Sequence, residues 1–116
     1  MVPFAGYEMP VQYKGVTEEH HAVRKGAGVF DVSHMGELDV QGDGAEAFID
    51  SLVTADLSKL PTGKAVYTMA CNEGGTILDD LIVYRKGATS FLVVCNASNR
   101  SKIVAHFQKH HAGRST

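Results

Sequence analysis

The sequence predicts an α+β fold, with helices packed on one face of an antiparallel sheet. Three segments in the second half of the chain have strand composition, and short turns that contain glycine separate them. Such turns favour hairpins, so the three strands should form an antiparallel meander. Two segments with apolar residues at helical spacing flank the meander and can pack on the sheet. The chain has 116 residues, enough for one compact domain, and we expect a single domain over residues 1–116.

The first quarter of the chain predicts a loop followed by a short helix. Proline and glycine punctuate residues 1–13, which is typical of a loop that leads into an edge strand. Thr17 is a candidate N-cap for a helix over residues 18–25, which has acidic residues in its first turn and basic residues in its last. Gly26 and Gly28 should end this helix.

Residues 30–40 predict a strand, because apolar and polar side chains alternate along them. Gly36 lies inside this run and predicts a bend. Asp43 is a candidate N-cap for the next segment, residues 45–53, where apolar side chains recur at helical spacing. We therefore expect a strand and then a helix that packs on the sheet.

Three further strands and a last helix complete the expected fold. The strands are expected over residues 65–71, 76–84 and 90–95. Ser98 or Asn99 should cap an amphipathic helix that ends near His111, and residues 113–116 should fray. The outermost strands of such a sheet have unpaired edges, which a missing part of the protein or a second copy of the chain could cover.

The composition argues against several classes of function. Eleven Lys and Arg against 13 Asp and Glu give a net charge of −2, which offers no electrostatic footprint for nucleic acid or a membrane surface. No apolar run approaches the roughly 20 residues of a transmembrane helix, and the start of the chain lacks a signal pattern. We therefore expect a cytoplasmic protein. Cys71 and Cys95 lie in apolar strand segments and should be buried, reduced thiols.

Asp79 and Asp80 are candidate functional residues because they lie in the most apolar strand segment, LDDLIVY. Neighbouring strand residues point to opposite faces, so the two carboxylates cannot act as an acid and base pair on one substrate. A carboxylate that faces the interior needs hydrogen-bond donors or a polar ligand, which makes whichever aspartate faces inward a functional candidate. Alternatively, both aspartates satisfy the backbone of the hairpin at Gly74–Gly75.

Polar and basic residues follow the last predicted strand. Asn96 and Asn99, with Arg100, come at its junction with a helix, where asparagine either caps the helix or presents amides to a ligand. His106 and His110 are four residues apart on that helix, the spacing at which two imidazoles can share one metal ion. No Cys, Asp or Glu completes a ligand set nearby in the sequence, so we expect no metal site.

Four stretches of the sequence together resemble one known family. They are MVPFAGYEMPVQY, AVRKGAGVFDVSHMGE, GKAVYTMACNEGGTILDDLIVY and VVCNASNR. They follow in order over nearly all of residues 1–111 and closely resemble the T-protein of the glycine cleavage system, a folate-dependent aminomethyltransferase. The resemblance implies a ferredoxin-like half of the folate-binding T-protein module. It also implies that the chain is an N-terminal portion of that enzyme, with the C-terminal part of the family's fold absent.

The resemblance implies a reaction and a site. The family transfers a one-carbon unit from an aminomethyl group on the lipoyl arm of the H-protein to tetrahydrofolate, and ammonia is released. Asp80 matches the family's essential aspartate near the reactive folate nitrogens, which selects one of the two residues that the strand pattern singles out. We therefore expect Asp80 to lie among apolar side chains, with a pterin ring as its partner. Residues that line the folate pocket are matched by Met35, Tyr67, Tyr84 and Asn96.

Two functions of different classes follow from the resemblance. In the first, the chain represents an aminomethyltransferase, and the 116-residue piece is inactive alone because its pocket is open on one side. In the second, the chain is a noncatalytic folate-binding or scaffold domain related to iron–sulfur cluster maintenance proteins. Retention of the DVSHM and LDDLIVY motifs favours the first function. Unpaired strand edges also predict a homodimer of the isolated chain.

Overall fold

The computed structural model describes residues 1–112, and contacts along the chain divide it into two units. The first unit is Met1–His34, and the second begins at Met35. One domain over residues 1–116 stays a prediction, and the fraying expected for residues 113–116 lies outside the described residues. Within the part of the chain that is described, no helix is long and apolar enough to cross a lipid bilayer.

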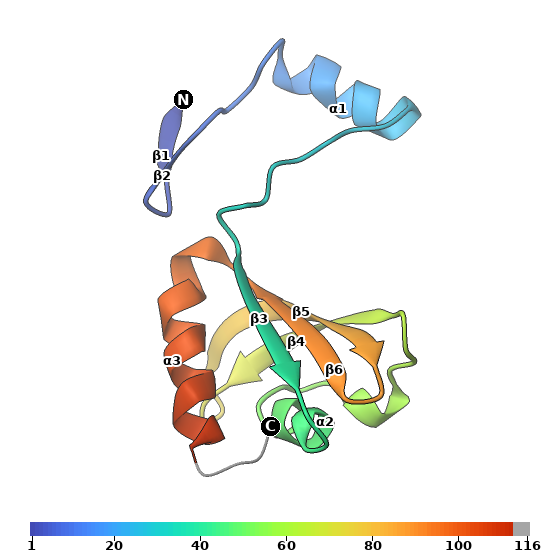
Figure 1. Ribbon diagram of the computed structural model, residues 1–116. Coiled ribbons are helices and arrows are strands. Elements are labelled where there is room, and N and C mark those ends of the chain that lie inside the picture. The colour runs from blue at the N-terminus through green and yellow to red at the C-terminus, as the bar shows by residue number, and fades with distance from the viewer. Residues whose placement is uncertain (113–116) are drawn as a thin grey trace. The chain divides into compact units, whose positions relative to one another are not determined.

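The first unit begins with a small hairpin where the sequence predicted a loop (Figure 1). β1 (Val2–Phe4) and β2 (Tyr7–Met9) pair in antiparallel fashion. Ala5 and Gly6 turn the chain between them with φ values of 50° and 84°. A two-residue hairpin loop of this kind needs positive φ at both positions, which alanine adopts rarely. The hairpin could not be predicted from the sequence, because Ala5 is not a residue that signals such a turn.

Helix α1 (Val16–Lys25) forms where the sequence predicts a helix, but its N-cap is Gly15, which has no side chain to offer. The carboxylate of Glu19 accepts hydrogen bonds instead, from the backbone N–H groups of Tyr13 and Gly15, at 3.1 Å each. A glutamate in the first turn thus satisfies N–H groups that have no partner within the helix.

No residue of the first unit is buried. Its exposed large apolar side chains are Met1, Val2, Phe4, Tyr7, Val11, Tyr13, Val16, Val23, Val29, Phe30 and Val32. Without a core of its own, a segment of this size gains too little from burial to offset the entropy of ordering its chain. The first unit therefore presents apolar side chains that another surface would have to cover.

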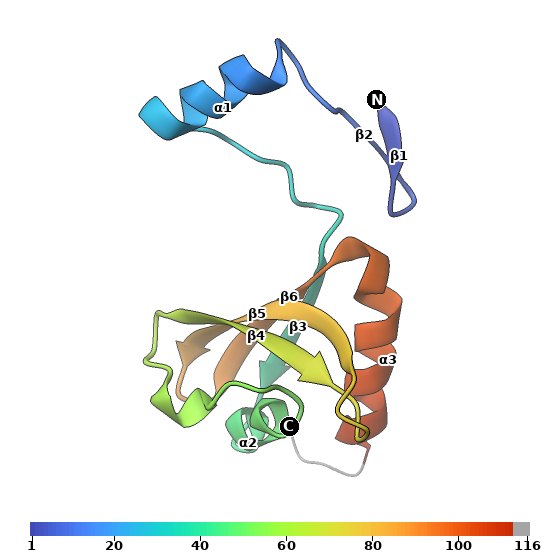
Figure 2. The ribbon, with the colours of Figure 1, turned by 180° about the vertical axis from the view of Figure 1, so that it is seen from behind.

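The second unit is built on a four-stranded antiparallel sheet. Its strands are β3 (Gly36–Gln41), β4 (Ala65–Cys71), β5 (Ile77–Gly87) and β6 (Ser90–Cys95). Their order is β3-β6-β5-β4, so β4, β5 and β6 form the predicted meander. The helical elements are α2 (Ala45–Asp50), η1 (Leu57–Lys59), η2 (Ala97–Asn99) and α3 (Arg100–His111). Figure 2 shows α3 lying alongside the sheet and α2 near its end.

The hydrophobic core of the second unit lies between the sheet and the helices. It includes Phe48, Ile49, Leu57, Leu81, Val83, Phe91, Val93, Ile103 and Phe107. Strand side chains at the intervening positions face the other way: Tyr67 on β4 is 65% exposed and Tyr84 on β5 is 40% exposed. One face of the sheet is thus packed and the other open. This arrangement confirms the predicted α+β class, with helices on one face of an antiparallel sheet.

The strand predicted over residues 30–40 is half wrong, because β3 begins only at Gly36. Asp31 accepts hydrogen bonds from the backbone N–H and the hydroxyl of Ser33, at 2.9 and 2.6 Å, and these local bonds turn the chain. Gly36 itself lies within the strand at a close approach. A Cβ atom there would come within 2.6 Å of the sulfur of Cys95, so no larger residue fits without a shift.

The helix predicted over residues 45–53 is shorter than expected. It ends at Asp50, whose carboxylate accepts a hydrogen bond of 2.8 Å from the backbone N–H of Leu57. Val53 then forms an isolated bridge with Ala70 of β4. The chain therefore leaves the helix early because it returns to pair with the outer side of the sheet.

Candidate functional site

The open face of the sheet carries a carboxylate near the start of β5. Asp80 lies opposite Met69 of β4 in the strand register, and the next residue, Leu81, lies opposite Cys95 of β6. Asn96 follows Cys95 directly and therefore comes beside Asp80, just past the end of β6. The sheet thus brings residues from neighbouring strands together around Asp80.

Asp80 accepts hydrogen bonds at both of its carboxylate oxygens. The Tyr67 hydroxyl donates to Oδ2, and Nδ2 of Asn96 donates to Oδ1 at 2.9 Å. These donors, Tyr67 above all, hold the pKa of Asp80 below its ordinary value. The same bond raises the pKa of Tyr67, because ionising the phenol would place two negative charges together. Asp80 is therefore an ionised carboxylate held in one orientation at neutral pH.

Two tyrosines frame the apolar part of the same face. Tyr67 pairs with Ile82 of β5, and Tyr84 follows two residues along that strand. Both rings are exposed, while Ile82 and its β6 partner Val94 are half-buried between the strands. An apolar surface with exposed aromatic rings and a carboxylate at its edge suits a flat heteroaromatic ligand that has polar groups on its rim.

Met35 lies at the same end of the sheet, directly before β3. The first residue of β3, Gly36, pairs with Cys95 of β6, so Met35 comes next to Asn96 when the register is continued. Hydrogen bonds join Asp80 to Tyr67 and Asn96, whereas the register alone brings the other two predicted residues to this surface. The predicted set of Asp80, Met35, Tyr67, Tyr84 and Asn96 lies entirely within the second unit.

The aspartate that faces the interior is Asp79, which is 4% exposed. Asp80 is half-buried and points to the open face, so the expectation that it lies among apolar side chains is wrong. The sequence could not show this, because alternation puts the two residues on opposite faces without saying which face the helices cover. Burial therefore identifies Asp79 as the candidate, whereas the resemblance identifies Asp80.

The alternative role for the two aspartates, in the Gly74–Gly75 hairpin, is also wrong. Asn72 satisfies that turn: its side-chain oxygen accepts a hydrogen bond of 2.9 Å from the backbone N–H of Thr76. Its backbone N–H donates to the carbonyl oxygen of Thr76 at 3.0 Å. The carboxylates of Asp79 and Asp80 instead accept hydrogen bonds from Asn96.

Asn99 is the N-cap residue of α3, as expected, yet its side chain does not cap the helix. Its amide nitrogen donates to Oδ1 of Asp79 at 2.8 Å. Arg100 then begins α3, with its stem beside Gly36 of β3. The asparagine at the junction after β6 therefore hydrogen-bonds a buried carboxylate and does not cap the helix.

The histidine and cysteine side chains give less support for a site. The rings of His106 and His110 lie 4.5 Å apart between centroids, and burial lowers the pKa of His106. Among residues 1–112, no three His, Cys, Asp or Glu side chains gather so as to hold a metal ion. Cys71 and Cys95 are free thiols, and burial raises the pKa of the Cys95 thiol.

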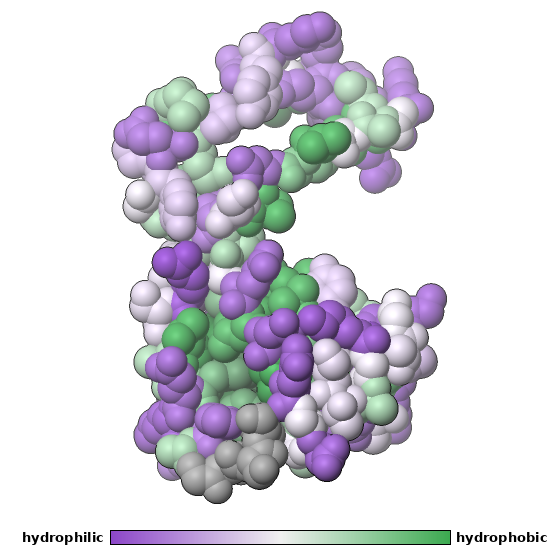
Figure 3. Space-filling view, in the orientation of Figure 1, coloured by the Kyte–Doolittle hydropathy of each residue, from purple (hydrophilic) through white to green (hydrophobic). Residues whose placement is uncertain are grey.

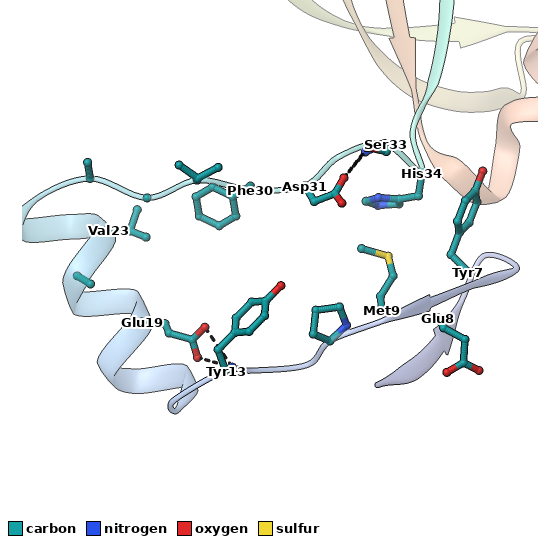
Figure 4. Close-up of a pocket in the computed structure, with 15 residues that line it drawn as sticks. Tyr7, Glu8, Met9, Tyr13, Glu19, Val23, Phe30, Asp31, Ser33 and His34 are labelled. Carbon is teal, nitrogen blue, oxygen red and sulfur yellow. Dashed lines mark hydrogen bonds between the residues drawn. The ribbon is translucent and has the colours of Figure 1, made fainter.

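A concavity inside the first unit was not foreseen from the sequence. It has a volume of about 470 Å³, and Figure 4 shows that its walls include Tyr7, Met9, Tyr13, Phe30 and His34. The ring of His34 meets that of Tyr7 edge-on, with centroids 6.3 Å apart. Some of these walls are exposed apolar side chains that lack a covering surface, such as Tyr13 and Phe30, and others are polar, such as Glu19 and Asp31. The hydrogen-bonded carboxylate of the second unit is the stronger candidate site.

Comparison with known sequences gives a family. The family described as "GCVT N-terminal domain" matches residues 1–116. An aminomethyltransferase of Rubrobacter xylanophilus is 54% identical over 112 residues, which are 97% of this chain and 30% of the relative. An aminomethyltransferase of Thermotoga maritima is 55% identical over 102 residues, or 88% of this chain and 28% of the relative.

Comparison with solved structures agrees with the sequence matches. The crystal structure of the glycine cleavage system aminomethyltransferase T from Bartonella henselae superposes with a TM-score of 0.87 at 34% sequence identity. The match covers 98% of this chain and 32% of that protein. The chain therefore spans only about 30% of the length of the relatives that it matches.

Proposed function

The chain belongs to the GCVT N-terminal domain family, and from that membership we propose that it is part of a folate-dependent aminomethyltransferase of the glycine cleavage system. Such an enzyme passes a one-carbon unit from the aminomethyl-lipoyl arm of the H-protein to tetrahydrofolate, with release of ammonia. Tetrahydrofolate supplies the nitrogen that takes up the carbon. Because the chain spans about 30% of its relatives, this activity is proposed for the full-length protein, and the isolated chain is expected to be inactive.

Asp80 is the proposed catalytic residue, and its paired hydrogen bonds are the observation that carries the proposal. The hydroxyl of Tyr67 and the amide of Asn96 keep the carboxylate ionised and fix its direction. It lies on the open face of the sheet, at the edge of the half-buried apolar surface formed by Ile82 and Val94. A carboxylate so placed can orient N–H groups of a ligand and stabilise positive charge that develops during transfer of the one-carbon unit.

The remaining predicted residues are proposed to line the folate pocket. The rings of Tyr67 and Tyr84 stand on the open face of the sheet and offer flat apolar contact to a pterin. Asn96 and Met35 close the same surface at the end of β6 and before β3. Each of these residues fits the chemistry of a flat ring with a polar rim, which is what supports a folate site here.

The proposed partners and location follow from the same function. They are the lipoylated H-protein and tetrahydrofolate, in the cytoplasm. The net charge of −2 gives no support for nucleic acid as a partner.

We also propose that the isolated chain forms a homodimer through β3. The outer edge of β4 is partly covered, because Thr54 donates a backbone hydrogen bond of 3.0 Å to Met69. β3 is the other edge strand of the sheet, and a groove of about 230 Å³ runs beside it, with Leu38, Val40 and Phe107 among its walls. Figure 3 shows hydrophobic surface along β3 and between it and α3. An open strand edge next to apolar surface favours pairing with another strand.

The folate site is tested by equilibrium binding of tetrahydrofolate to the full-length protein. Replacing Tyr84 with alanine should weaken binding by about 5-fold or more, because ring stacking of this kind contributes roughly 1–3 kcal/mol. Replacing Tyr13 with alanine, in the first unit and 80% exposed, is the matched control and should leave the affinity unchanged. Equal affinities for the Tyr84→Ala variant and the unsubstituted protein would contradict the proposed site.

A further inference from the structure

Asp79 is a buried carboxylate to which the proposed reaction gives no role. Its side chain faces the helices and is 4% exposed, so water contributes little to its solvation. Three N–H donors replace that water. Asn96 donates to Oδ2 from its backbone nitrogen at 2.9 Å and to Oδ1 from its side chain at 2.9 Å. Asn99 donates to Oδ1 at 2.8 Å.

The side-chain nitrogen of Asn96 is the atom that joins Asp79 to Asp80. It lies 2.9 Å from Oδ1 of Asp79, 2.9 Å from Oδ1 of Asp80 and 3.0 Å from the carbonyl oxygen of Asp80. All three neighbours are acceptors, which fixes the amide with its nitrogen toward the aspartates and its oxygen away from them. Two N–H groups are thus shared among three acceptors on the two sides of β5.

The geometry points to Asp79 as a positioning residue: it holds the Asn96 amide so that one N–H group is directed at Asp80, on the opposite face of the sheet. Asn96 can reach both aspartates because it lies past the last paired residue of β6, in an extended conformation with φ −67° and ψ 144°. The value of this link for catalysis rests on the proposed role of Asp80. The link itself is a property of the chain without folate.

The conformation of Asn99 is independent support for a structure organised around Asp79. Asparagine is among the best N-cap residues, and a side-chain cap stabilises a helix by roughly 0.5–2 kcal/mol. Asn99 stands at the N-cap of α3 without forming that bond and donates to Asp79 instead. At the junction of η2 and α3, the side-chain amide of Asn99 therefore satisfies the buried carboxylate and not the first turn of α3.

Direct charge repulsion by Asp79 and positioning through Asn96 shift the pKa of Asp80 in opposite directions. If Asp79 acted only as a nearby negative charge, its removal would lower the pKa of Asp80. If Asp79 acts by directing Asn96, its removal also frees the Asn96 amide to turn away from Asp80. Asp80 then loses a hydrogen-bond donor, and its pKa rises toward the ordinary value. A double-mutant cycle separates the two effects, because the second exists only while Asn96 is present.

The experiment is a carbon-13 NMR titration of the Asp80 carboxyl group in the 116-residue chain, with Asp79→Ala measured with and without Asn96→Ala. We expect Asp79→Ala to move the pKa of Asp80 further upward when Asn96 is present than when it is replaced. The control is Asn99→Ala, which removes one hydrogen-bond donor from Asp79 and leaves both Asp79 and Asn96 in place. The pKa of Asp80 in this variant should stay near that in the unsubstituted chain. Equal effects of Asp79→Ala in both backgrounds would overturn the proposal.

A second measurement needs no variant and remains available if Asp79→Ala does not fold. Scalar coupling across hydrogen bonds should connect the side-chain nitrogen of Asn96 with the carboxyl carbons of both Asp79 and Asp80 in the unsubstituted chain. Absence of the coupling to Asp79 would contradict the inference. Neither measurement involves folate, so a failure here is distinct from a failure of the proposed function, which the binding of tetrahydrofolate tests.

Discussion

The hydroxyl of Tyr67 on β4 donates a hydrogen bond to the carboxylate of Asp80 on the neighbouring strand β5. The two residues are diagonal neighbours on the open face, since Tyr67 lies opposite Ile82 and Asp80 lies two residues before it. This contact orients the one carboxylate of the proposed site without burying it. It also gives the site a pH dependence that can be measured without substrate.

Replacing Tyr67 with phenylalanine should raise the pKa of Asp80 toward its ordinary value, because the strongest donor to the ionised form is lost. A carboxyl group with a lowered folded-state pKa stabilises the fold above its unfolded pKa, and this stabilisation is lost as the pH falls through the folded value. The stability difference between Tyr67→Phe and the unsubstituted chain should therefore shrink under strongly acidic conditions. Urea unfolding of both proteins at neutral and acidic pH measures this difference in the free energy of unfolding.

The matched control for this prediction is Tyr84→Phe, which removes a tyrosine hydroxyl from the same face of the sheet, on β5 instead of β4. Its effect on the free energy of unfolding should not follow the titration of Asp80. A Tyr67→Phe variant whose stability deficit stayed constant down to strongly acidic pH would show that the hydroxyl does not support the ionised carboxylate.

Replacing Phe48 with alanine should destabilise the second unit by about 3–5 kcal/mol. Phe48 of α2 is 2% exposed and meets the ring of Phe107 edge-on, with centroids 5.8 Å apart, so its loss leaves a cavity in the core. Phe30 is 69% exposed, and Phe30→Ala should change the free energy of unfolding by less than about 0.5 kcal/mol. Chemical denaturation followed by circular dichroism makes the comparison, and similar losses for both variants would show that Phe48 is not a core residue.

Arg85 connects β5 to the helical layer, and replacing it with methionine should cost roughly 2–4 kcal/mol. Its guanidinium pairs with Glu46 of α2 at 2.6 Å and donates to the carbonyl oxygen of Leu60 at 3.0 Å. The adjacent Lys86 forms a more exposed ion pair with Asp39 at 2.6 Å, and Lys86→Met should cost at most about 1 kcal/mol. The same denaturation assay compares the two variants, and equal losses would rule out the network around Arg85 as a stabilising contact.

The isolated chain should associate reversibly into a dimer with rising concentration, which analytical ultracentrifugation detects. Leu38 lines the groove beside β3, so Leu38→Lys should weaken association, because an inward-pointing charge on an edge strand opposes pairing. Glu37 is the exposed neighbour in β3, and Glu37→Lys is the control that should still associate. A monomer at all concentrations would contradict the proposed pairing of edges.

Local signals explain which elements the sequence predicts well. The strands over residues 65–71 and 90–95 have the predicted bounds, because apolar runs and glycine turns mark their ends. The strand expected from residue 30 fails because Asp31 and Ser33 form a turn that competes with alternation. Ala5 adopts a positive φ that its identity does not suggest.

The candidate site shows the limits of sequence pattern more clearly. Alternation alone places Asp79 and Asp80 on opposite faces, yet only the packing of α2 and α3 decides that Asp79 is the inner one. The amides of Asn96 and Asn99 meet Asp79 through contacts 17 and 20 residues apart in the chain. No local pattern specifies contacts between such distant residues, which is why the link between the two carboxylates emerges only from the structure.

The most direct test of the account is ammonia release by the full-length protein supplied with tetrahydrofolate and aminomethyl-lipoyl H-protein. Asp80→Asn keeps the shape of the side chain and removes its charge, and it should lower kcat by about 100-fold or more. Asp39→Asn, on the exposed edge strand β3, should leave kcat unchanged. Unchanged turnover in Asp80→Asn would contradict the catalytic role of Asp80, and folate binding without any ammonia release by the unsubstituted protein would instead identify a noncatalytic folate-binding domain.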